Sequence, residues 1–92
     1  MEIKGLTFTL FTRACPEQYD VTDANGNLVG YVRLRWGVLR CDCPKWGEET
    51  IYEYDFHEDY KGCFDSDEER NTYLGLIADE VLKRMNALKK EE

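Results

Sequence analysis

The sequence is poor in long apolar runs and in positive charge. No apolar segment approaches the roughly 20 residues that a membrane-spanning helix needs. Residues 1–5 contain no basic region followed by an apolar one, so we expect no signal peptide and a cytoplasmic protein. The 12 Lys and Arg are outnumbered by 19 Asp and Glu, which gives a formal net charge of −7. This charge argues against binding to nucleic-acid phosphates or anionic membranes, because both need a basic surface.

Signatures of common catalytic sites are also missing. There is no glycine-rich phosphate-binding loop and no nucleophile elbow. The only histidine is His57 and the only serine is Ser66, so a Ser-His-acid triad would have to use both, and neither lies in a recognisable triad context. The residues alone therefore indicate no catalytic chemistry.

Alternating apolar and polar residues dominate the first two thirds of the chain. The length of 92 residues fits a single domain, residues 1–92, and a hydrophobic content of 42% is enough for a core. Alternation in segments rich in Thr, Val, Tyr and Phe is typical of strands with one buried face. Asn25-Gly26 predicts a two-residue hairpin turn and Trp36-Gly37 a second tight turn. The predicted strands cover residues 6–12, 18–24, 28–35, 38–43 and 50–56.

The hydrophobic period changes near the end of the chain. Ser66 and Glu69 form a capping box, which marks a helix start. From Tyr73 to about Leu88, apolar residues recur every three or four positions and define one apolar stripe, with Gly75 as a weak point. A helix over residues 67–88 should bury this stripe on the sheet. The sequence thus predicts an α+β fold: a five-stranded antiparallel sheet with one C-terminal helix packed on one face.

Negative charge is concentrated in residues 48–69. This stretch holds ten acids and one base, a net charge of −9, so the rest of the chain sums to +2. One interpretation is a solvated edge strand followed by helix-capping acids; the other is a surface that binds a basic protein partner. A calcium loop is not indicated, since no D-x-D-x-D-G pattern occurs. The candidate contact acids are Glu48, Glu49, Glu53, Asp55, Glu58, Asp59, Asp65, Asp67 and Glu68.

Trp36 and Trp46 lie in predicted turns, where a tryptophan either covers the core or anchors a partner. Arg33 and Arg35 share the outward face of a predicted strand, and Arg40 should lie beside them. We expect these arginines to pair with Glu53 and Asp55 of the neighbouring strand. The alternative is a second contact surface.

Four cysteines are the sharpest chemical feature: Cys15, Cys41, Cys43 and Cys63. Disulfides rarely persist in a reducing cytosol, whereas four thiolates supply the complete ligand set of a structural zinc ion. In a simple meander, however, Cys15 lies at the opposite end of the sheet from Cys41 and Cys43. A subset site of Cys41, Cys43 and Cys63 with His57 would avoid this difficulty. The alternatives are buried small hydrophobes, or a Cys-His catalytic pair without an evident orienting residue.

The length, the acidity of residues 48–69 and the four cysteines together resemble small anti-CRISPR proteins of phages and mobile elements, in particular zinc-containing α+β inhibitors of type II-A Cas9. The resemblance implies a non-enzymatic inhibitor with a structural zinc site. It would bind Cas9 in the bacterial host cell and block loading of target DNA, with its acidic surface facing the basic channel of Cas9. We expect a monomer that does not bind nucleic acid directly. The alternatives are an acidic regulatory or adaptor protein with another partner, and a Cys-dependent thiol or metal enzyme.

Overall fold

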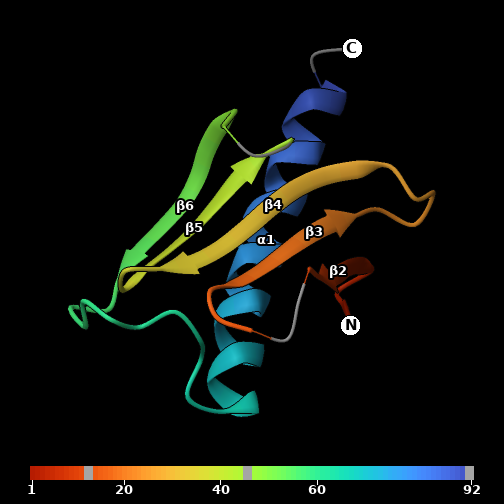
Figure 1. The fold of residues 1–92 in the computed structure, drawn as a ribbon. Helices are drawn as coiled ribbons and strands as arrows, with labels where there is room; N and C mark the ends of the chain where they lie inside the picture. Colours follow the sequence, from red (N-terminus) through yellow and green to blue (C-terminus); the bar gives the residue numbers. More distant parts are fainter. Residues whose placement is uncertain (12–13, 45–46, 91–92) are drawn as a thin grey trace.

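The fold has two layers, an antiparallel sheet and one long helix that crosses a single face of it (Figure 1). The computed structural model describes residues 1–11, 14–44 and 47–90, the last three by main chain only. The strands follow one another in the sheet in chain order, as a meander. The elements are β1 (Glu2–Ile3), β2 (Leu6–Leu10), β3 (Glu17–Thr22), β4 (Leu28–Arg35), β5 (Val38–Cys43), β6 (Glu49–Asp55) and α1 (Asp67–Lys90). The predicted α+β class, with a C-terminal helix after an antiparallel sheet, is confirmed.

The sheet has six strands where five were predicted, because β1 is too short to produce a periodic signal. Its two residues pair with the start of β2 across a turn in which Lys4 and Gly5 both have positive φ, 54° and 86°. Two residues cannot display a period of two. Lys4 then fastens this hairpin to the helix, since its Nζ lies 2.7 Å from Oδ1 of Asp79.

The hairpin between β3 and β4 is confirmed, but its predicted two-residue turn is wrong. Only Gly26 has a positive φ, 82°, whereas a two-residue turn of the expected type requires it at Asn25 as well. Asp23 closes a longer loop instead: its Oδ1 accepts hydrogen bonds from the backbone N of Asn25 and of Asn27, each at 2.9 Å. These bonds lower the pKa of the Asp23 carboxyl. The loop conformation is thus stabilised by the short side chain of Asp23, whose carboxylate accepts hydrogen bonds from the backbone N–H groups of the loop.

The buried face of the sheet follows the predicted alternation. Tyr19 of β3 lies opposite Val32 of β4, which lies opposite Cys41 of β5, and all three are buried. Because side chains directly across a ladder lie on the same face, this register places the apolar set of every central strand under the helix. A shift by one residue would expose it.

The helix buries the predicted stripe. Leu74, Ile77 and Val81 are fully buried, while Tyr73 and Met85 pack at the border of the core. The predicted contribution of Leu88 lies outside the described side chains. In the part of the chain that the structure describes, no helix is long and apolar enough to cross a membrane.

Gly75 offers a direct test of helix propensity in this fold. It lies within α1, and a Cβ added there would meet no atom within 4 Å. We expect Gly75→Ala to raise the free energy of unfolding by about 0.5–1 kcal/mol, because alanine loses less backbone entropy in a helix. Urea denaturation followed by circular dichroism measures this change.

The matched control is Gly37→Ala. Gly37 has φ 76°, and an added Cβ would lie 2.4 Å from the carbonyl O of Glu58. This variant should lose stability by about 1 kcal/mol or more. Equal effects of the two substitutions would contradict the assignment of Gly75 to an unobstructed helix position.

Candidate functional site

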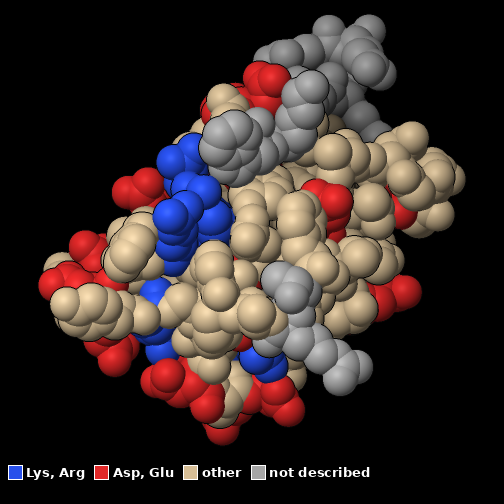
Figure 2. All heavy atoms as spheres, in the orientation of Figure 1, with Lys and Arg blue, Asp and Glu red and all other residues tan. Residues whose placement is uncertain are grey.

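The predicted contact acids gather along β6, the loop after it and the first turn of α1. All nine of them are exposed. Figure 2 shows acidic side chains along the left and lower borders of the molecule, beside β6 and the helix start. We call this group the acidic surface; it comprises Glu48, Glu49, Glu53, Asp55, Glu58, Asp59, Asp65, Asp67 and Glu68.

Lys61 holds the loop of the acidic surface against the domain. Its side chain is only 4% exposed, and its Nζ lies 3.0 Å from Oδ1 of Asp65 and 2.9 Å from Oε1 of Glu69. The same Nζ lies 5.0 Å from the centre of the Phe56 ring. Burial lowers the pKa of Lys61, but its bonds to Glu69 and Asp65 outweigh burial and raise it overall. The ammonium group therefore stays charged and offsets the repulsion between the carboxylates of this loop.

Several carboxylates remain free to meet a partner. Glu49 pairs with Arg84, and Asp67 pairs with Arg70. Within the described residues, Glu53, Asp59 and Glu68 have no ion pair, and all three are exposed. These unpaired charges can attract a basic surface without first breaking an internal bond.

The expected pairing of Arg40 with Glu53 is wrong, although the two residues lie opposite each other in the β5–β6 ladder. Arg40 instead makes two bonds of 2.9 Å to the buried carboxylate of Asp42. That carboxylate also accepts bonds from Gly47 N at 3.0 Å and Thr50 Oγ1 at 2.7 Å. The Arg40 bonds outweigh the opposing effect of burial and lower the pKa of Asp42 to about 2. Arg40 thus pairs with Asp42 of its own strand, and Glu53 stays without an ion pair.

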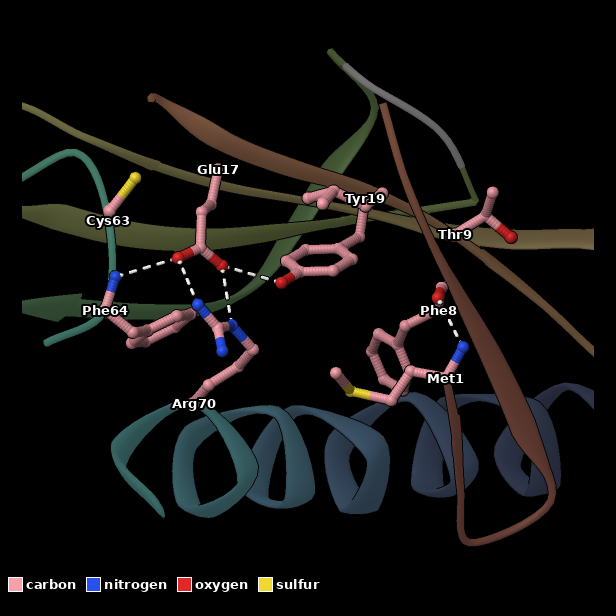
Figure 3. A pocket seen from close by; sticks show the side chains of 9 residues that line it. Met1, Phe8, Thr9, Glu17, Tyr19, Cys63, Phe64 and Arg70 are labelled. Carbon is pink, nitrogen blue, oxygen red and sulfur yellow. Dashed lines mark hydrogen bonds and ion pairs between the residues drawn. The ribbon is translucent and has the colours of Figure 1, made fainter. Parts of the chain in front are cut away.

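A second buried carboxylate, Glu17, positions the start of α1 (Figure 3). Arg70 approaches it side-on, with Nε 3.0 Å from Oε2 and Nη2 2.9 Å from Oε1. The hydroxyl of Tyr19 and the backbone N of Phe64 donate further bonds, at 2.6 and 3.0 Å. Burial raises the pKa of Glu17, but the bonds from Arg70, Tyr19 and Phe64 outweigh it and lower the pKa overall. Burial and the bond to Glu17 raise the pKa of Tyr19.

A cavity of 540 Å³ opens beside this ion pair, lined in part by Phe8, Tyr19 and Phe64. The polar side chains on its wall, Glu17 and Arg70, are bonded to each other. A ligand would therefore have to displace bonds that hold the helix start in place. The other charged group on the wall is the Met1 ammonium, which donates a hydrogen bond to Phe8 O at 3.2 Å.

The structure does not bring the four cysteines together. Cys15 and Cys63 form a disulfide with Cα atoms 5.5 Å apart, while Cys41 and Cys43 are free thiols buried beneath the helix. The described residues contain no group of three or more His, Cys, Asp and Glu arranged to hold a metal ion. The predicted zinc site with four cysteine ligands therefore does not fit this structure, and neither does the expectation that disulfides are absent. The physical reason is the meander, which separates the two pairs along the strands.

The alternative ligand set with His57 does not fit either. The side chain of His57 is 88% exposed and lies beside Asp55, with Nδ1 3.9 Å from Oδ1. A hydrogen bond with the Cys43 thiol, together with burial, raises the pKa of Cys41. The same hydrogen bond lowers the pKa of Cys43. Cys41, as a buried and protonated thiol, is a poor nucleophile and a poor zinc ligand. Ser66 accepts a bond from the backbone N of Glu69 at 3.0 Å, so it acts as the predicted helix cap.

Exposed aromatic residues border the acidic surface at the end of the sheet. Trp36 is 63% exposed, and Tyr60, which the sequence interpretation missed, is 93% exposed. Both line one shallow depression at the end of the sheet, together with Arg35 and Cys15. The only sequence signal for Tyr60 is that an aromatic residue directly follows two acids, Glu58 and Asp59, in a long polar loop. Trp46 lies outside the described residues.

Comparison of the chain with protein-family models, curated proteins and solved structures finds no match. The functional argument therefore depends on the residues and their geometry. The geometry offers charge and exposed aromatic side chains at one border of the sheet, which suits binding better than catalysis.

Removal of the Arg70 guanidinium should destabilise the domain strongly. Arg70→Met keeps the aliphatic stem but leaves Glu17 as a buried charge without its main partner. We expect a loss of about 3–5 kcal/mol in the free energy of unfolding, measured by urea denaturation. Arg35→Met, at an exposed arginine, is the control and should change it by less than about 1 kcal/mol. Adding Glu17→Gln to Arg70→Met should recover part of the loss; a loss below about 1 kcal/mol in the single variant would contradict this role.

Thiol counting tests the cysteine assignment. Protein kept without reductant should contain two free thiols per chain, which react only after unfolding because Cys41 and Cys43 are buried. Cys15→Ser should release Cys63 and give three. We expect no stoichiometric zinc by elemental analysis. Four reactive thiols together with one bound zinc ion would overturn the disulfide assignment.

Proposed function

We propose that this protein is a non-enzymatic inhibitor that binds type II-A Cas9 through the acidic surface and blocks loading of target DNA. The naming of Cas9 rests on the resemblance of the whole chain to anti-CRISPR proteins. The mode of binding rests on one observation: nine exposed carboxylates lie along β6, the following loop and the helix start. A surface of this sign is complementary to the positively charged channel that holds the guide–target duplex.

The aromatic residues support a contact at the loop end of the acidic surface. Trp36 and Tyr60 line the same depression, and Glu58 and Asp59 precede Tyr60 in the loop. Large aromatic side chains supply much of the energy in protein interfaces, while charged residues at the rim speed association. The charge would steer the partner, and the aromatic side chains would hold it.

The action that we propose takes place in the cytoplasm of the bacterial host, where a disulfide is not expected to persist. The loop does not depend on the disulfide alone. Gly37 N donates to Lys61 O at 2.8 Å, and Glu17 N donates to Gly62 O at 2.7 Å. These bonds would keep the acidic surface in place with Cys15 and Cys63 reduced. The structural zinc ion is not part of this proposal, because the donor set does not fit it.

An acidic regulatory or adaptor protein with a different basic partner is the second candidate. The same exposed carboxylates support it, and only the identity of the partner differs. A Cys-dependent thiol or metal enzyme is not favoured, since the adjacent thiols Cys41 and Cys43 are buried.

Neutralising the unpaired acids tests the proposal. The unmodified protein, in excess over the Cas9–guide complex, should stop cleavage of matched linear DNA. It should do so when added before the DNA and not when added after target loading. The triple variant Glu53→Gln, Asp59→Asn, Glu68→Gln should inhibit about tenfold more weakly, because each lost charge reduces attraction to the basic channel. Cleavage is measured on gels over a titration of inhibitor.

Glu2→Gln is the matched control, since Glu2 is exposed and lies outside the acidic surface. It should inhibit as the unmodified protein does. Inhibition by the unmodified protein should also weaken as salt is raised, because salt screens exposed charges. Unchanged DNA cleavage at excess protein would refute binding to Cas9 as the function, and a basic partner recovered from host lysate would then favour the adaptor.

A further inference from the structure

In the part of the chain that the structure describes, one edge of the sheet is open. There β6 is the last strand in the sheet order and pairs with β5 alone (Figure 1). It is seven residues long, and most of its residues are exposed. The opposite edge is formed by β1, which has only two residues. An open strand of this length presents unpaired N–H and C=O groups to which another strand can bind.

The direction of these main-chain groups follows from one hydrogen bond. Phe56 N donates to Gly37 O at 2.8 Å, just beyond the ladder of β5 and β6. Bonded and non-bonded pairs alternate along an antiparallel ladder. The N–H and C=O groups of Glu53 and Asp55 therefore point away from β5, toward the open edge. These are two of the residues of the acidic surface.

The two faces beside this edge differ in chemistry. The Tyr54 ring lies 5.3 Å from the Tyr73 ring of α1, so Tyr54 is on the helix side of β6. Glu53 and Asp55, its neighbours in the strand, are consequently on the opposite, open side. In a strand added to β6, every second side chain would lie on the open side, next to Glu53 and Asp55. The side chains between them would lie on the helix side.

On the helix side, a groove of 420 Å³ runs between β6 and α1. Its apolar wall includes Tyr52, Leu82 and Leu76. Leu76 is a large apolar side chain that is 45% exposed. Asp79, Glu80 and Lys83 also line the groove, and both acids are paired, Asp79 with Lys4 and Glu80 with Lys83. The groove therefore accepts apolar side chains, and the unpaired negative charge beside this edge is that of Glu53 on the opposite face.

We propose that β6 binds its partner by strand addition, and that the added segment is an extended stretch of the partner that alternates basic and apolar residues. This inference rests on the proposed function, because it assigns a docking mode to the same acidic surface. Basic side chains would face Glu53 and Asp55, and apolar ones would enter the groove beside Tyr52 and Leu76. A second copy of this chain does not fit, because pairing of two β6 strands would place like charges opposite each other.

A peptide probe tests strand addition without any change to the protein. The probe is a nine-residue peptide of alternating Lys and Val, acetylated and amidated, and its binding is followed by NMR titration. N-methylation at every Lys, or at every Val, removes the donors from one of its two edges. We expect one set to weaken binding about tenfold or more and the other to leave it unchanged, since only one edge faces β6. If the peptide adds antiparallel to β6, methylation at the Lys residues should weaken binding; if it adds parallel, methylation at the Val residues should do so. Equal effects of the two methylated peptides would refute strand addition.

Matched variants of the protein give the second test. Glu53→Pro removes the outward N–H and leaves the bonds to β5, whereas Glu53→Gln removes only the charge. Glu53→Pro should bind the peptide about tenfold more weakly than Glu53→Gln, as expected for a lost hydrogen bond in the interface. Equal affinities of two folded variants would refute strand addition. If Glu53→Pro does not fold, amide exchange of Glu53 and Asp55 in the unmodified protein decides, since bound peptide should slow it.

The two proposals fail in different ways. If the unmodified protein does not inhibit Cas9 but the methylated peptides differ as expected, the Cas9 assignment fails and strand addition stands. If the protein inhibits Cas9 and the two methylated peptides bind equally, strand addition is refuted and the acidic surface stands as a purely electrostatic contact.

Discussion

The bonded pair of Glu17 and Arg70 is the interaction on which the arrangement of this domain depends. Glu17 opens β3, Arg70 lies near the start of α1, and the backbone N of Phe64 joins the same carboxylate from the connecting loop. A buried charge is costly unless its lone pairs are satisfied, and here four donors satisfy them. The polar requirement of one carboxylate therefore fixes the helix start, the loop and the sheet relative to one another.

The acidic surface is a consequence of this arrangement. Once the helix start is fixed, the loop after β6 must return across the end of the sheet. Lys61, the disulfide and the backbone bond to Gly37 hold it there. Because one buried ammonium group balances part of the negative charge, the remaining carboxylates can stay exposed at modest cost. The charge that would otherwise oppose folding is thereby kept at a border of the molecule, next to an open strand.

Electrostatic attraction and main-chain pairing can then act at the same edge of the sheet, β6. Charge acts at a distance and is indifferent to register, whereas main-chain pairing at β6 is short-ranged and directional. The exposed ring of Tyr60, in the loop after β6, and the groove beside Tyr52, in the middle of β6, add apolar contact. Acids on an open edge also discourage self-association, so the same residues that suit a basic partner oppose pairing of two copies.

The sequence by itself determined most local elements, though not β1 or the loop between β3 and β4, because periodicity and capping act over a few residues. The β4 and β5 boundaries agree with their patterns, and Ser66 caps α1 as its capping box predicts. The sequence also located the negative charge. Only the tertiary structure decided that Cys15 forms a disulfide with Cys63. It also decided that Arg40 pairs with Asp42, which leaves Glu53 without an ion pair, and that Arg70 pairs with Glu17. Cys15 and Cys63 are 48 residues apart, and Glu17 and Arg70 are 53 apart. Such pairings depend on sheet register and on the route of the loop, which no local pattern encodes.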